Sequence, residues 1–103
     1  AFPLAEAKMR LDAAELMIRK ASWLIDNGQP CGAEANMAKW LAADAAFFAA
    51  DRAVQTHGGF GYATEYHVER YWREARLMKI APISQEMVQN FVSEHVLELP
   101  KSY

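Results

Sequence analysis

Residues 4–25 read LAEAKMRLDAAELMIRKASWLI, and apolar side chains recur in this stretch at intervals of three and four positions. The recurring side chains are Leu4, Ala7, Leu11, Ala14, Ile18, Ala21 and Ile25. This spacing places them on one face of an α-helix. Because large residues alternate with alanines, a partner helix can approach this face closely. The pattern predicts a helix from about Leu4 to Asn27, ended by Gly28 and Pro30.

A second helix is predicted from about Ala33 to His57, and it is apolar nearly all round. One side of this helix carries the large side chains of Trp40, Phe47 and Val54. Alanines fill most of the opposite side. The first helix is two-sided as well, with a second apolar set away from its main face: Met9, Leu16 and Trp23. Helices with apolar surface all round are usually buried in bundles or oligomers. We therefore expect a dimer or higher oligomer in solution.

Two carboxylates, Asp44 and Asp51, interrupt the aromatic stripe of the second helix. A buried carboxylate needs a partner, so we expect Asp44 to meet an Arg or Lys from another element. The alternative is a catalytic pair of carboxylates. It is less favoured, because seven positions on a helix separate the two groups by about 10 Å.

Two shorter helices are predicted in the last part of the chain. Opposite charges four positions apart support a third helix from about Thr64 to Met78. Pro82 ends it, because the residue before a proline disfavours helical backbone. Ser84 is then a suitable N-cap for a fourth helix with Glu86 in its first turn. The predicted fold class is all-α, an up-and-down four-helix bundle that forms one domain over residues 1–103.

Composition limits the class of function. The chain has 103 residues, of which 52% are hydrophobic and 23% charged, and its formal net charge is −2. These values are ordinary for a single soluble globular domain. No cluster of Lys and Arg indicates binding to nucleic acid or to an anionic membrane. The sequence also lacks an apolar run of about 18 residues and a signal-peptide pattern.

Cys31 is the only cysteine of the sequence. An intramolecular disulfide is therefore impossible, and a reducing compartment is expected: the bacterial cytoplasm or the mitochondrial matrix, not the exterior. No His or Cys spacing indicates a metal site, so no metal is expected.

Three glycines fall within four positions in the stretch QTHGGFGY, Gln55 to Tyr62. One interpretation is a helix stop, in which Gly58 takes left-handed backbone while Gly59 and Gly61 shape the connection. A dinucleotide fingerprint is rejected, because no strand precedes the glycines and their spacing differs from G-x-G-x-x-G. A third interpretation adds close approach of the backbone to a phosphate-bearing cofactor or a partner chain, with the Gln55 amide beside it. The residue types alone leave the first and third interpretations open.

A longer pattern surrounds these glycines, and residues 53–80 read AVQTHGGFGYATEYHVERYWREARLMKI. This stretch resembles the C-terminal helical domain of the acyl-CoA dehydrogenase family. The resemblance lies in an ordered string of residue types: Gln55, Gly58, Gly59, Gly61, Tyr62, Glu65, Tyr66, Val68, Glu69, Arg70, Arg73, Glu74 and Ala75. Residues 38, 39 and 44 also match, and the resemblance covers nearly the whole chain.

The resemblance implies a flavoenzyme function. Members of the family bind FAD and oxidise an acyl-CoA thioester to the 2,3-enoyl-CoA, using a carboxylate to remove a proton and the flavin to take a hydride. Their chains comprise an N-terminal helical domain, a middle β domain and a C-terminal bundle. The chain is therefore expected to be the last domain of a longer enzyme, inactive by itself, with the first helix of the bundle upstream of Ala1. Its expected partners are an acyl-CoA, an electron acceptor, and further subunits in a homo-oligomer or a paired complex.

The resemblance also implies cofactor contacts. In the family, the Gln-x-x-Gly-Gly element packs against the adenosine diphosphate portion of the FAD of a neighbouring subunit. Carried over to this sequence, Gln55, Gly58 and Gly59 are expected to contact FAD in trans. Ser84 replaces a family threonine and is expected to keep a hydroxyl contact to the flavin nucleotide.

The resemblance fails at Pro82, which stands where many members have the catalytic glutamate. A proline cannot abstract a proton, so no catalytic residue is expected in this chain. The base would then lie on the preceding helix of the bundle, or the chain would be a base-less subunit paired with a competent one. The remaining alternative is a structural or non-dehydrogenase member of the superfamily. Glu86 as a relocated base is less favoured, because a carboxylate in a first helical turn is explained by the helix dipole.

Overall fold

The structure is a computed structural model that describes residues 1–101. Its elements in chain order are the helices α1 (Phe2–Asp26) and α2 (Gly32–His57), the 3-10 turns η1 (Gly58–Tyr62) and η2 (Thr64–Tyr66), the helices α3 (Val68–Leu77) and α4 (Gln85–Phe91), and the π-helical η3 (Val92–Val96). No strand occurs among these 101 residues. The prediction of an all-α fold with four helices is confirmed.

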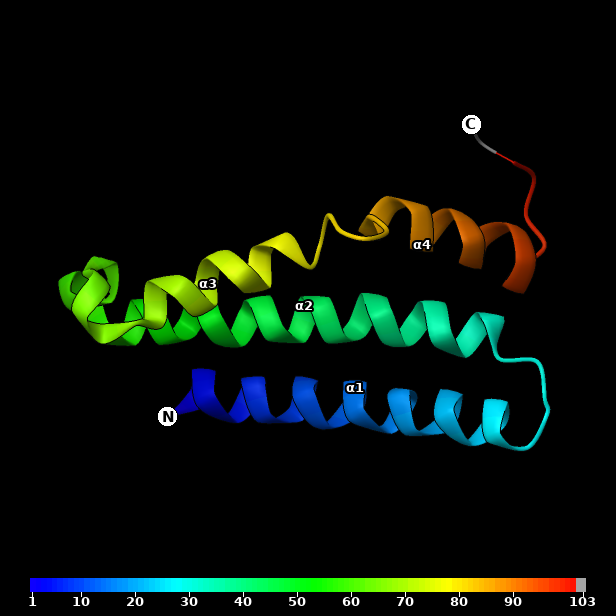
Figure 1. The fold of residues 1–103 in the computed structure, drawn as a ribbon, viewed down its shortest axis with the longest axis horizontal. Coiled ribbons are helices and arrows are strands. Elements are labelled where there is room, and N and C mark those ends of the chain that lie inside the picture. Colours follow the sequence, from blue (N-terminus) through cyan, green and yellow to red (C-terminus); the bar gives the residue numbers. More distant parts are fainter. Residues whose placement is uncertain (102–103) are drawn as a thin grey trace.

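α2 forms the middle layer of the domain (Figure 1). α1 runs antiparallel to α2 on one side, while α3 and α4 follow each other along the opposite side. The N-terminus of α1 and the turns η1 and η2 lie at one end of the domain, and the α1–α2 connection lies at the other. The all-round apolar character of α2 therefore has a structural reason, because other helices cover it on two sides.

The core is built largely from alanine. Its buried hydrophobic members are Ala7, Ala14, Ala38, Ala43, Ala45, Val68 and Val88. Small side chains let helices approach one another closely. The larger members of the predicted α1 face are exposed: Leu4, Leu11, Ile18 and Ile25. The predicted face is thus confirmed for Ala7 and Ala14 but not for its large residues, because α1 lies against α2 alone among the described elements.

The two later helices differ in how well the sequence predicts their starts. α3 begins at Val68 and not near Thr64, because His67 takes left-handed backbone with φ 65° and separates η2 from α3. α4 begins as predicted, since the Ser84 Oγ accepts a hydrogen bond of 3.2 Å from the backbone N–H of Met87. None of the helices in residues 1–101 has the length and apolar character that a membrane span requires.

Candidate functional site

The end of α2 is set by Gly58. Its backbone has φ 61° and ψ −139°, a conformation that L side chains rarely adopt. Its N–H donates to the carbonyl oxygen of Gln55, in the last turn of the helix. The helix-stop interpretation therefore explains Gly58.

Gly61 shapes the connection, as the helix-stop interpretation expects, through a close contact that the sequence did not identify. It is buried, and a Cβ atom added to it would lie 2.5 Å from the backbone oxygen of Val54. The bare backbone lets η1 fold back against the last turn of α2. Sequence spacing gives no sign of this contact, because it depends on how the chain reverses in space.

Gly59 is exposed, and a Cβ atom added to it would meet no described atom within 4 Å. Its φ is not in the left-handed region, so backbone geometry does not require glycine either. Gln55 is exposed one turn earlier on the same end of the domain. An exposed amide and an open stretch of backbone therefore lie together at the end of α2, and neither is explained by contacts within residues 1–101.

Ser84 lies elsewhere. It is half-buried at the start of α4 and borders a cavity of about 350 Å³ together with Arg76 and Lys79. The first turn of α4 bonds to α2 at Trp40, and the 17 residues from there to His57 correspond to about 25 Å of helix. Gln55, Gly58 and Gly59 therefore lie together at the end of α2, whereas Ser84 caps α4, which lies farther back along α2 (Figure 1).

Pro82 is exposed in the connection between α3 and α4, and its peptide bond with Ala81 is cis. Ile80 and Ile83 are exposed on either side of it. The connection thus presents apolar side chains at the place where many members of the family that the sequence resembles have a catalytic carboxylate. Glu86 is exposed in the first turn of α4, where its charge suits the positive end of the helix dipole.

The aspartates of α2 are held by separate partners. Asp44 accepts hydrogen bonds from Arg10 of α1 at 3.1 Å and from Lys79 at 3.3 Å. This confirms the prediction that Asp44 meets cations from other elements, and Asp44 joins all three layers of the domain. Its partners give it a structural role, which explains an acidic residue on a mostly apolar helix.

Asp51 is bonded to the Arg52 guanidinium at 2.9 Å and to the Trp72 indole N–H at 3.1 Å. These bonds, that of Arg52 above all, hold the pKa of the Asp51 carboxyl below its ordinary value. Asp51 is therefore ionised at neutral pH and already bonded on both oxygens. The structure gives no support to a catalytic pair with Asp44.

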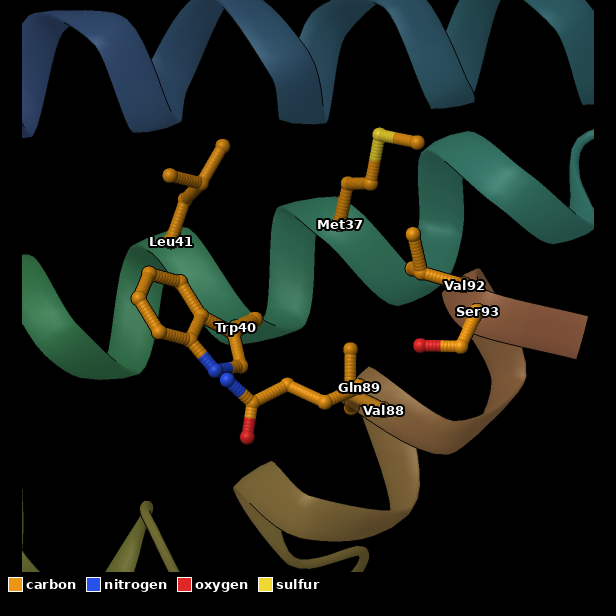
Figure 2. A pocket seen from close by; sticks show the side chains of 7 residues that line it. All are labelled: Met37, Trp40, Leu41, Val88, Gln89, Val92 and Ser93. Carbon is orange, nitrogen blue, oxygen red and sulfur yellow. The ribbon is translucent and has the colours of Figure 1, made fainter. Parts of the chain in front are cut away.

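An open cavity of about 390 Å³ lies between α2 and α4 (Figure 2). It is lined mainly by apolar side chains: Met37, Trp40, Leu41, Val88, Gln89, Val92 and Ser93. The indole nitrogen of Trp40 is buried without a hydrogen-bond partner among the described residues, and Figure 2 shows the Gln89 amide pointing toward it. The cavity includes none of the residues that the sequence predicts as cofactor contacts.

The chain matches known proteins along nearly its whole length. The family model described as "Acyl-CoA dehydrogenase, C-terminal domain" matches residues 1–97. The chain belongs to this family. It is 50% identical to "Acyl-CoA dehydrogenase FadE12" of Mycobacterium tuberculosis, a match that covers all of this chain and 27% of the relative. It is 40% identical to "Probable acyl-CoA dehydrogenase YngJ" of Bacillus subtilis, covering 94% of this chain and 26% of the relative.

A solved structure supports the same membership. The butyryl-CoA dehydrogenase of Megasphaera elsdenii superimposes on 93% of this chain and 25% of its own chain, with a TM-score of 0.89 and 34% identity. The chain spans about a quarter of the length of the curated relatives it matches. The helical architecture expected from the resemblance is thereby confirmed.

Proposed function

We propose that this domain is the C-terminal part of a longer FAD-dependent acyl-CoA dehydrogenase that oxidises an acyl-CoA to the 2,3-enoyl-CoA. Its own contribution is to bind part of the cofactor and to assemble subunits. Family membership supports this activity, and the relatives come from bacteria, which favours the bacterial cytoplasm over the mitochondrial matrix.

The observation that carries the proposed cofactor contact is the exposed end of α2. Gly58 is explained by its positive φ and Gly61 by its contact with the Val54 backbone, whereas Gly59 is explained by neither. A glycine that its own chain does not require is explained if another group approaches its backbone closely. The Gln55 amide on the same end can donate and accept hydrogen bonds. This pair of features fits the adenosine diphosphate portion of an FAD molecule held by a neighbouring subunit.

FAD, when bound, accepts the hydride that leaves the acyl chain. The residues of this domain would contribute by contacting the cofactor and holding it in place. Gln55 hydrogen-bonds the nucleotide portion, Gly58 and Gly59 let it approach the backbone, and Ser84 contacts a flavin nucleotide from its separate place on α4.

The catalytic base is proposed to lie outside this domain. Pro82 has no ionisable group, and its neighbours Ile80 and Ile83 are apolar and exposed. A carboxylate from another segment of the parent protein, or from a paired subunit, would remove the α proton. The electron acceptor is likewise supplied by a partner protein.

A second candidate function is assembly without chemistry. It is favoured by four exposed apolar side chains that recur every seven positions along α1: Phe2, Met9, Leu16 and Trp23. Such a stripe on a free surface favours association. Light scattering of the parent protein is expected to show a dimer or larger assembly, and a monomer would count against either form of the proposal.

The test of the cofactor role is Gly59→Leu in the parent protein. A Cβ atom there meets no described atom within 4 Å and the position is exposed, so the thermal unfolding of the apoprotein should stay close to that of the unchanged protein. FAD content after purification, measured by visible absorbance, should fall because the side chain blocks the approach of the nucleotide. Gln29→Leu, which adds the same side chain in the exposed α1–α2 connection, should keep its FAD. Full FAD content in Gly59→Leu would refute the proposed contact.

A further inference from the structure

Gln85 is the first residue of α4 and directly follows Ser84. Within residues 1–101 it is the one polar side chain that is buried, with 8% of its surface exposed. A buried amide without hydrogen-bond partners would destabilise the fold, because it loses its bonds to water. Its hydrogen bonds therefore determine where the start of α4 can lie.

Both ends of the Gln85 amide are bonded to α2. Its Oε1 accepts from the Lys39 Nζ at 3.0 Å, and its Nε2 donates to the backbone oxygen of Trp40 at 3.0 Å. The backbone N–H of Gln85 also donates to the carbonyl oxygen of Lys79 at 3.1 Å, across the connection between α3 and α4. Lys79 is itself bonded to α2 through Asp44. The connection is thus fixed to α2 at both ends.

The geometry leaves the neighbouring hydroxyl available to a ligand. The Ser84 Oγ accepts from the Met87 N–H, so the hydrogen of the hydroxyl group can still be donated. Gln85 borders the same cavity as Ser84, but it is buried and both ends of its amide are already bonded to α2. Hydrogen bonds are directional, so a displacement of the connection would break one or both amide bonds. The amide of Gln85 therefore restricts the position of the Ser84 hydroxyl.

We propose that Gln85 is a positioning residue of the flavin-nucleotide site, which acts through Ser84 by fixing the start of α4 to Lys39 and Trp40 of α2. This inference rests on the proposed function, because it assumes that Ser84 contacts the nucleotide. It assigns a role to a buried side chain that itself touches no cofactor.

The experiment is a double-mutant cycle on the FAD-containing parent protein with Gln85→Leu, Ser84→Ala and the double variant. The measured quantities are the dissociation constant for FAD and, separately, the thermal unfolding midpoint of each apoprotein. Each single variant should weaken FAD binding about tenfold, the loss expected for one hydrogen bond to a charged or polar group. If Gln85 acts through Ser84, the double variant should bind FAD no more weakly than Ser84→Ala, although its unfolding midpoint is lower.

Two further variants control for stability. Gln29→Leu makes the same change at an exposed position of the α1–α2 connection, away from the cavity that Ser84 borders, and it should leave FAD affinity unchanged. If Gln85→Leu does not fold, Gln85→Glu replaces it in the cycle, because it keeps an acceptor for Lys39 and loses only the donor to Trp40.

The outcomes separate the inference from the function on which it rests. If Ser84→Ala weakens FAD binding and the effect of Gln85→Leu is simply additive, the positioning role is refuted while the cofactor contact stands. If Ser84→Ala leaves FAD affinity unchanged, the contact at Ser84 and the role of Gln85 both fail, whereas Gly59→Leu still tests the end of α2. A parent protein without FAD would overturn the proposed function and this inference together.

Discussion

Gly61→Ala should destabilise the domain, although it adds only a methyl group. The added Cβ would lie 2.5 Å from the backbone oxygen of Val54 and 3.1 Å from the carbonyl carbon and Cα of the same residue. A comfortable distance between carbon and oxygen is about 3.3 Å or more. The overlap is with helical backbone, so it cannot be relieved by rotating a side chain, and η1 has to move away from α2.

Overpacking of this kind costs about 1–3 kcal/mol. The lower entropy of the unfolded chain offsets about 0.4–1 kcal/mol of that cost. The middle of these ranges gives a net loss of about 1.3 kcal/mol, which corresponds to a decrease of about 5–10 °C in the unfolding midpoint of a domain of this size. Thermal unfolding followed by circular dichroism measures it directly.

Gly59→Ala is the matched control, two positions earlier in the same turn. Its methyl group meets nothing within 4 Å and its φ is permissive, so the midpoint should stay the same or rise slightly. Equal midpoints for Gly59→Ala and Gly61→Ala would refute the close contact between η1 and α2 and the explanation given for Gly61.

Two charged sites on α2 give further predictions. Asp44→Ala removes a half-buried carboxylate that is bonded to two cations, and it should lower the free energy of unfolding by about 1–2 kcal/mol in urea titrations. Asp12 is exposed, so Asp12→Ala should change the free energy of unfolding little. Equal losses in the two variants would contradict a structural role for Asp44. The bonds from Arg52 and Trp72 lower the pKa of Asp51 from 3.8, so their stabilisation is present above that pH and is lost as the pH falls below it. Asp51→Asn should therefore have a lower free energy of unfolding than the unchanged protein near neutral pH, and this difference should shrink below about pH 3.8. A difference in the free energy of unfolding that stays constant down to about pH 2.5, or grows in acid, would contradict this explanation.

Periodicity predicts the two long helices well, because apolar residues recur at helical spacing over many turns and a glycine, Gly28 or Gly58, follows shortly after each end. The Ser84 N-cap is predicted for the same kind of reason, since a cap depends only on residues within one turn. The start of α3 is not predicted. His67 takes left-handed backbone between η2 and α3, and helical periodicity gives no sign of such a break.

The candidate site likewise has local features, which the sequence predicts, and contacts between distant segments, which it does not predict. The helix stop at Gly58 is a local property and is predicted from the residue type. The contact of Gly61 with Val54, and that of Gln85 with Lys39 and Trp40, join segments whose relative positions the sequence pattern does not give. The residues that fix the site geometry are therefore harder to find from the sequence than those that would touch the ligand.

The central position of α2 has a consequence for how the domain opens. α1 can separate from α2 without disturbing α3 or α4, because among the described elements it contacts α2 alone. α3 and α4 both contact α2 as well, so α2 can be exposed fully only when every other helix has left it. Amide hydrogens in the middle of α2 should accordingly be the last to exchange with solvent deuterium, and those of α1 should exchange earlier through local opening. The order in which the amide hydrogens exchange would therefore test the arrangement of the helices without any substitution.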